Sequence, residues 1–159
     1  MLRALLALMA LALSTSSALA QEERKTPYWA SISADEALMR AGPGRNYPGK
    51  WLYRRADLPI RILEVYPSWR KVRDPDGAEG WMLVNLLSDT RTALVTGSEP
   101  RPMHEQPSDT AAVRYRAEPG VVGRISRCAN GWCELAVGGR SGHIRTDHIF
   151  GVDPGESIE

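Results

Sequence analysis

Residues 58–84 read LPIRILEVYPSWRKVRDPDGAEGWMLV, and this stretch says more about the fold than any other part of the chain. Three runs in it are rich in apolar and β-branched residues, which favours short strands; they span residues 58–65, 69–73 and 80–84. The turns between them contain Pro67-Ser68 and Asp74-Pro75-Asp76-Gly77. Proline presets φ for a turn and glycine accepts a positive φ, so the stretch predicts three strands joined by tight turns.

The same pattern returns between residues 118 and 150, so one motif is used twice. Trp69 lies 12 positions before Trp81, and Trp132 lies 11 positions before His143. Internal duplication with frequent turns predicts two small β modules, at residues 28–88 and 91–152. Modules of about 60 residues have few strands and are expected to close into barrels, which removes exposed sheet edges. Such small modules bury little alone, so we expect them to pack on each other through Leu94 and Val95.

The composition agrees with an all-β protein. Gly and Pro together number 25 of 159 residues, and five Trp and five Tyr accompany a single Phe. Turn-forming, β-branched and Trp/Tyr-rich sequences favour short strands over long helices. The charge is balanced, with 20 basic and 19 acidic residues, which argues against nucleic acid or an anionic membrane surface as a partner.

The N-terminus has the pattern of a cleaved signal peptide at residues 1–20. Arg3 precedes ten apolar residues, and the small-residue triplet Ala18-Leu19-Ala20 follows. Ten apolar residues are too few to span a bilayer as a helix, and no cysteine follows the triplet to carry a lipid. A buried N-terminal helix or a retained anchor is the alternative. We expect a periplasmic or secreted protein with no stable membrane anchor, folding in an oxidising compartment.

The two cysteines, Cys128 and Cys133, flank a predicted tight turn. This spacing can place them opposite each other on paired strands, so an oxidising compartment predicts a disulfide. A zinc site with His143 and His148 is the alternative, but the helix that normally carries both histidines is not predicted. Cysteine–histidine catalysis would need the thiolate that a disulfide removes. No metal and no cofactor are therefore expected.

The sequence resembles a known family, the bacterial SH3-like domain. The resemblance is carried by Leu38–Gly44, Tyr47-Pro48, Trp69–Val72, Gly80-Trp81 and Leu86–Ser88. Over residues 28–152 the chain is similar to the tandem, exported SH3-like proteins of alphaproteobacteria, whose second repeat carries a hairpin like Cys128–Cys133. In this sequence His143 replaces the usual tryptophan, and residues 105–109 lack the Gly-Pro-Gly element. The resemblance implies two tandem small SH3-like β-barrels, all-β, after the cleaved signal peptide.

A ligand site is predicted on the first repeat, between the Gly42–Pro48 loop and the turn before Trp69. Alternation along the strands places Val72 and Leu135 inside the barrels, so Trp69 and Trp132 point outward. Tyr47 and Trp69 would then offer flat apolar walls, and Arg45 could meet a carboxylate. The alternatives are that the tryptophans seal the barrels or pack between repeats, and that the loop packs only on itself.

The sequence favours a protein that binds rather than catalyses. It contains neither Gly-x-Ser-x-Gly nor His-Glu-x-x-His. The resemblance implies a recognition module of the bacterial cell envelope, for peptidoglycan stem peptides or an extended protein segment. A structural or assembly protein that docks on an envelope partner is the first alternative. A minimal cell-wall hydrolase is the second, and it lacks a recognisable nucleophile and base.

Overall fold

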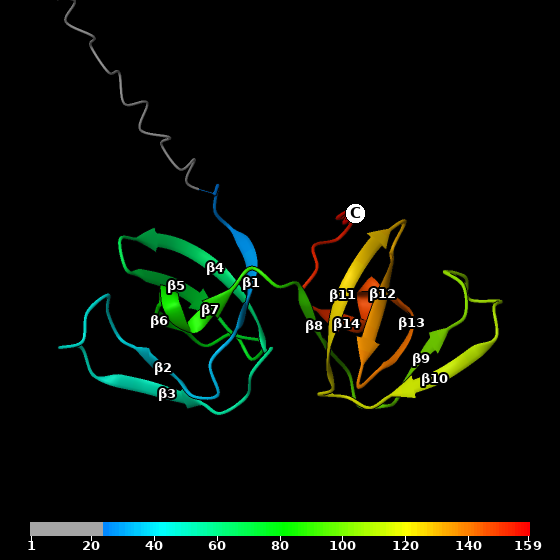
Figure 1. The fold of residues 1–159 in the computed structure, drawn as a ribbon, viewed down its shortest axis with the longest axis horizontal. Helices are drawn as coiled ribbons and strands as arrows, with labels where there is room; N and C mark the ends of the chain where they lie inside the picture. The colour runs from blue at the N-terminus through cyan, green and yellow to red at the C-terminus, as the bar shows by residue number, and fades with distance from the viewer. Residues whose placement is uncertain (1–23) are drawn as a thin grey trace, which may run out of the picture.

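The computed structural model describes residues 24–159, and the predicted signal peptide at residues 1–20 lies outside the described residues. The chain forms two seven-stranded antiparallel sheets, which follow each other along the sequence (Figure 1). The first contains β1 (Tyr28–Ile32), β2 (Ala37–Arg40), β3 (Gly49–Tyr53), β4 (Pro59–Tyr66), β5 (Trp69–Arg73), β6 (Glu79–Leu83), the 3₁₀ turn η1 (Val84–Leu86) and β7 (Leu87–Ser88). The second contains β8 (Thr92–Val95), β9 (Arg101–His104), β10 (Val113–Ala117), β11 (Val122–Ala129), β12 (Trp132–Val137), β13 (Arg140–Arg145), the 3₁₀ turn η2 (Thr146–His148) and β14 (Ile149–Phe150).

The two sheets have the same topology, strand for strand. The first has the order β3-β2-β6-β5-β4-β1-β7 and the second β10-β9-β13-β12-β11-β8-β14. Even the β-bulge recurs, between Ile62 and Glu64 in β4 and between Ile125 and Arg127 in β11. The duplication predicted from the sequence is therefore confirmed, and each strand of one repeat can be matched to a counterpart in the other.

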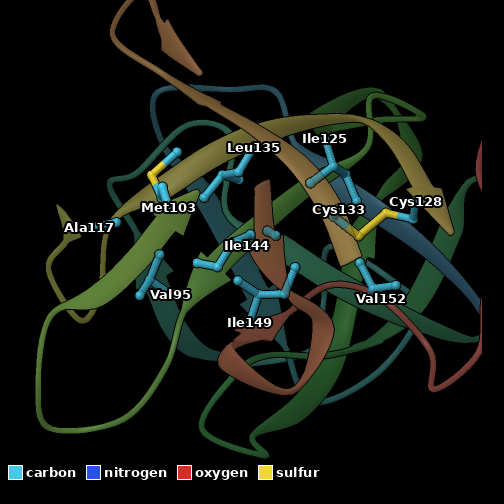
Figure 2. Packing of buried hydrophobic residues seen from close by; sticks show 11 residues of the cluster. Val95, Met103, Ala117, Ile125, Cys128, Cys133, Leu135, Ile144, Ile149 and Val152 are labelled. Atoms are coloured by element: carbon cyan, nitrogen blue, oxygen red, sulfur yellow. A yellow bond between two sulfur atoms is a disulfide. The ribbon is translucent and has the colours of Figure 1, made fainter. Parts of the chain in front are cut away.

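Each sheet curls around its own apolar core. The first core is formed by Ala30, Ile32, Ala37, Met39, Leu58, Ile60, Ile62, Val72 and Met82. The second is formed by Ala93, Val95, Met103, Ala117, Ile125, Cys128, Cys133, Leu135, Ile144, Ile149 and Val152, most of which are labelled in Figure 2. Val72 and Leu135 are completely buried, as the alternation predicted. Burial of such aliphatic side chains contributes about 1.5–3 kcal/mol each, so these two clusters supply most of the stability of the folded chain.

One buried carboxylate organises the turn between β5 and β6. Asp74 Oδ1 accepts hydrogen bonds from the backbone N–H groups of Asp76 (3.0 Å) and Ala78 (2.7 Å), while Oδ2 accepts one from the Tyr53 hydroxyl (2.8 Å). Gly77 has a φ of 88°, which glycine adopts without strain. The turn is therefore tied to β3 by a side chain as well as by its own backbone.

The repeats contact each other through apolar and charged residues. Leu94 and Val122 of the second repeat pack against the first core. Val95 was expected to join them, but it is buried in the second core instead, because neighbours on a strand face opposite ways. Arg61 bonds to Asp153 across the junction (2.6 Å), and its guanidinium lies over the Trp29 ring, which meets Phe150 edge to face at 4.8 Å.

Cys128 and Cys133 are joined by a disulfide that lies next to Val152 in the second core (Figure 2). Both sulfurs are bonded to each other, so neither is a thiolate that could take part in the alternative zinc site. Across residues 24–159, no three His, Cys, Asp or Glu side chains gather as metal ligands. Over the same residues, no helix has both the length and the apolar character needed to cross a membrane.

Candidate functional site

The loop between β2 and β3, at residues 41–48, is fixed by its own hydrogen bonds. Ala41 N–H donates to the Pro48 carbonyl (3.0 Å), and Tyr47 N–H donates to the Gly44 carbonyl (3.2 Å). Arg40 Nη1 donates to the Tyr47 carbonyl (2.8 Å). The loop is therefore pre-shaped, and binding there would cost little ordering entropy.

The Tyr47 ring explains why glycines are needed in this loop. The ring lies against Gly42, where a Cβ atom would clash with it. At Gly44 a Cβ atom would lie 3.3 Å from ring carbon Cδ2, and the closer obstacle is Asn46 Oδ1 at 2.5 Å. Even so, 43% of Tyr47 is exposed, and Arg45 is exposed without an ion pair within residues 24–159. The loop thus packs on itself and still exposes an aromatic ring and a guanidinium to solvent.

The structure corrects the role expected for Trp69. Its strand partners are Tyr66 and Leu83, and only 7% of the residue is exposed, whereas an outward, open ring was expected. A ring buried to this degree cannot serve as an open wall for a ligand. Within the part of the chain that the structure describes, no hydrogen bond or ring contact joins Trp69 to Tyr47. Arg45 and Tyr47 therefore lie on one loop, and Trp69 is a separate packing residue.

The sequence did not predict a contact between an exposed tyrosine and a half-buried tryptophan near Trp69. Tyr66 is 52% exposed and meets Trp81 edge to face, with ring centroids 6.3 Å apart. Tyr66 lies directly opposite Trp69 across the β4–β5 hairpin. A two-residue turn at Pro67-Ser68 makes Tyr66 and Trp69 partners across the hairpin, so the sequence could have predicted that these two residues are neighbours.

The second repeat contains an equivalent loop, at residues 105–112, whose flanking side chains contact each other. His104 occupies the position of Arg40, and its Nδ1 lies 2.8 Å from the Ala111 carbonyl, so this nitrogen carries the proton. The His104 ring meets Trp132, the counterpart of Trp69, edge to face at 5.5 Å. Trp132 is half-buried by this contact rather than standing free.

The two loops differ most clearly in the charge of one residue and in whether that charge is paired. Asp109 stands at the position of Arg45, and Arg145 binds it (3.0 Å) while also binding Asp147 through two nitrogens (3.0 and 3.1 Å). The hydrogen bond from Arg145 lowers the pKa of the Asp147 carboxyl. The charged group of the second loop is therefore already paired, whereas Arg45 of the first loop has no ion-pair partner in the described part of the chain.

Comparison with known proteins identifies the family. The family model of the bacterial SH3 domain matches residues 33–89 and again residues 97–151. The chain belongs to the bacterial SH3 domain family. Its two matches correspond to the two sheets, so this is a tandem SH3 protein, and the sequence resemblance to this family is confirmed. No curated protein matches the chain.

Among solved structures, the chain is similar to a NlpC/P60 family protein from Bacillus cereus ATCC 10987. It is 12% identical with a TM-score of 0.35, and the match covers 77% of this chain and 55% of that one. NlpC1 from Trichomonas vaginalis is 13% identical with a TM-score of 0.36, covering 82% of this chain and 48% of that one. NlpC2 from Trichomonas vaginalis has the same identity and TM-score, covering 79% and 48%. The chain spans about half the length of each of these proteins.

Proposed function

We propose that this tandem SH3 protein is a non-enzymatic recognition module of the bacterial cell envelope. Its ligand would be a peptidoglycan stem peptide or an extended protein segment. The observation that carries the proposal is the contrast between the two loops: Arg45 is exposed and has no ion-pair partner among residues 24–159, whereas Asp109 at the same position is bound by Arg145. Membership of the SH3 family supports binding as the activity, and the N-terminal sequence supports export.

The first-repeat loop suits a peptide with a free carboxylate. A guanidinium can hold a carboxylate through two parallel hydrogen bonds, which are stronger than bonds between neutral groups. Beside it, Tyr47 offers an apolar ring with a polar edge, a combination that recognises peptides and sugars. Trp51 and Leu52 on β3 extend the exposed apolar surface beyond the loop. Trp69 has a supporting role in this proposal, because a buried ring stabilises its hairpin and cannot cover a ligand.

The test is a pull-down of the purified protein on isolated cell-wall sacculi. Retention on sacculi supports wall recognition. Absence of retention, with one envelope protein co-purifying, contradicts it and supports the assembly role. Release of soluble wall fragments contradicts a non-enzymatic role and points to hydrolysis. Stem peptides with and without the terminal carboxylate then show whether Arg45 meets that group.

A further inference from the structure

The C-terminal segment of the chain adds one more strand residue to the second repeat. Ile158 N–H donates to the Cys128 carbonyl and Cys128 N–H donates to the Ile158 carbonyl, both at 2.9 Å. The Ile158 side chain packs against the second core, next to the disulfide. Two residues away, Glu156 is bound by Arg91 at 2.6 and 3.0 Å. The end of the second barrel is thus closed by an extended segment with one branched apolar side chain and a carboxylate.

The matching position in the first repeat is Val65. Both Val65 and Cys128 follow the bulge, and their partners across the hairpin are Arg70 and Cys133. Strand β1 begins at Tyr28, opposite Ile62, so its pairing with β4 stops before Val65. Among residues 24–159, no backbone segment is bridged to Val65 as Ile158 is to Cys128.

The backbone of Val65 points toward this edge, which no other strand of the described residues 24–159 pairs with. The two-residue turn at Pro67-Ser68 makes Tyr66 and Trp69 a hydrogen-bonded pair. In an antiparallel ladder the next pair is non-hydrogen-bonded, so Val65 turns its N–H and C=O away from β5. Cys128 turns its N–H and C=O away from β12 in the same way, and both groups are hydrogen-bonded to Ile158. The first repeat therefore presents one donor and one acceptor in the geometry that an added strand requires.

A pocket lies beside this edge, at the open end of the first barrel. Its volume is about 570 Å³. Its lining combines apolar side chains with a charged rim, and comprises Tyr28, Ala30, Ile62, Val65, Val84 and Leu87 with Arg24, Arg70, Ser88 and Asp89. Asp89 is already bound by Arg24 at 3.0 Å. Arg70 also lines the pocket; its Nη1 donates to the Tyr66 and Trp69 carbonyls (both 2.9 Å), and its guanidinium has no carboxylate partner among residues 24–159. In the second repeat the place of Arg70 is taken by Cys133 and its disulfide.

We propose that the edge of β4 at Val65 and the adjoining pocket bind an extended segment of a partner protein by strand addition. The segment carries a branched apolar residue that enters the pocket and a carboxylate that meets Arg70. The chain itself shows the backbone part of this arrangement, because Ile158 forms the bridge to Cys128 in the second repeat. A carboxylate accompanies that bridge too, although it is Glu156 and it is held by Arg91. Its own C-terminus cannot fill both sites, since Ile158 is bound at Cys128. The site is separate from the Arg45 loop and is independent of the function proposed for that loop.

The probe is a synthetic peptide with the sequence of residues 153–159, titrated into the full-length protein and followed by backbone amide NMR. Strand addition predicts saturable shifts at Tyr28, Val65 and Arg70, with slowed hydrogen exchange of the Val65 amide. Changing the peptide isoleucine to aspartate, or methylating its backbone nitrogen, should weaken binding by about tenfold or more, because each removes one required contact. The protein is unaltered in these comparisons, so a failure to fold cannot account for the result.

Two results would overturn the proposal. One is that shifts appear only around Cys128, which would mean that the peptide merely exchanges with the C-terminus. The other is that no shifts appear at Val65, or that the N-methylated peptide binds as well as the parent peptide. Arg70→Gln in the protein should weaken binding of the parent peptide. It should not change binding of a peptide whose acidic residues are all amidated.

Discussion

At the scale of single residues, Tyr53 and Asp74 show how one contact ties a turn to a neighbouring strand. The pKa of the Tyr53 hydroxyl is raised, first because burial disfavours the phenolate and second because the hydroxyl donates to Asp74. A raised tyrosine pKa means that the folded state holds its proton more tightly than the unfolded state does. The hydroxyl thus contributes stability only while it remains protonated.

This contact predicts an alkaline loss of stability. The contribution of Tyr53 is fully present below the unfolded tyrosine pKa of about 10 and is lost as the pH rises above it. Tyr53→Phe should be less stable than the parent at pH 8, and the difference should shrink as the pH approaches 11. Urea unfolding across this range measures it. A difference that grows with pH would contradict the assignment.

Trp69 and Trp51 predict opposite responses to truncation. Replacing a buried tryptophan with alanine leaves a cavity and costs about 3–5 kcal/mol, so Trp69→Ala should strongly destabilise the first repeat. Trp51 is exposed on the same sheet, and Trp51→Ala should change the unfolding free energy by about 0.5 kcal/mol or less. Denaturant unfolding compares them. Equal effects would mean that Trp69 is not the packing residue that its burial indicates.

At the scale of strands and turns, the sequence predicted what local chemistry determines. The Asp74–Gly77 turn and the Asn130-Gly131 turn occur where expected, and Asn130 and Gly131 take φ values of 52° and 82°. Alternation along β5 did not predict the burial of Trp69, because alternation assigns a residue to one face of a sheet and does not show what covers that face. The bridge between Ile158 and Cys128 was also missed, since a one-residue pairing leaves no periodic pattern.

Because the β4–β5 and β11–β12 hairpins are equivalent, we expect that a disulfide can be introduced into the first at the position that it occupies in the second. Val65 and Arg70 face each other as Cys128 and Cys133 do, so Val65→Cys with Arg70→Cys should oxidise spontaneously. The short loop should stabilise the first repeat by about 2 kcal/mol in the chain-entropy model. Mass spectrometry and unfolding with and without reductant measure both effects. The single variant Val65→Cys is the control, and two free thiols in the double variant would show that the hairpins differ.

At the scale of the whole molecule, two small barrels share an apolar junction. Leu94 belongs to the second repeat but packs against the first core, so the stability of one repeat depends on the other. Leu94→Ala should lower the unfolding free energy by roughly 1–2 kcal/mol, less than for a fully buried leucine. Exposed Val113→Ala on β10 should change it by about 0.5 kcal/mol or less. Calorimetry provides the comparison, and no effect of Leu94→Ala would mean that the barrels are energetically independent.

Recognition of the cell wall by the first-repeat loop rests on Arg45, and the exposed Arg116 on β10 of the second repeat provides a matched control. A charge-assisted hydrogen bond contributes about 1.5–3 kcal/mol, so Arg45→Ala should weaken binding to sacculi by about tenfold or more. Arg116→Ala removes the same charge and should bind as the parent does. The measurement is the dissociation constant of each variant on the same sacculus preparation. If Arg45→Ala and Arg116→Ala bind equally well, the first-repeat loop is not the binding site.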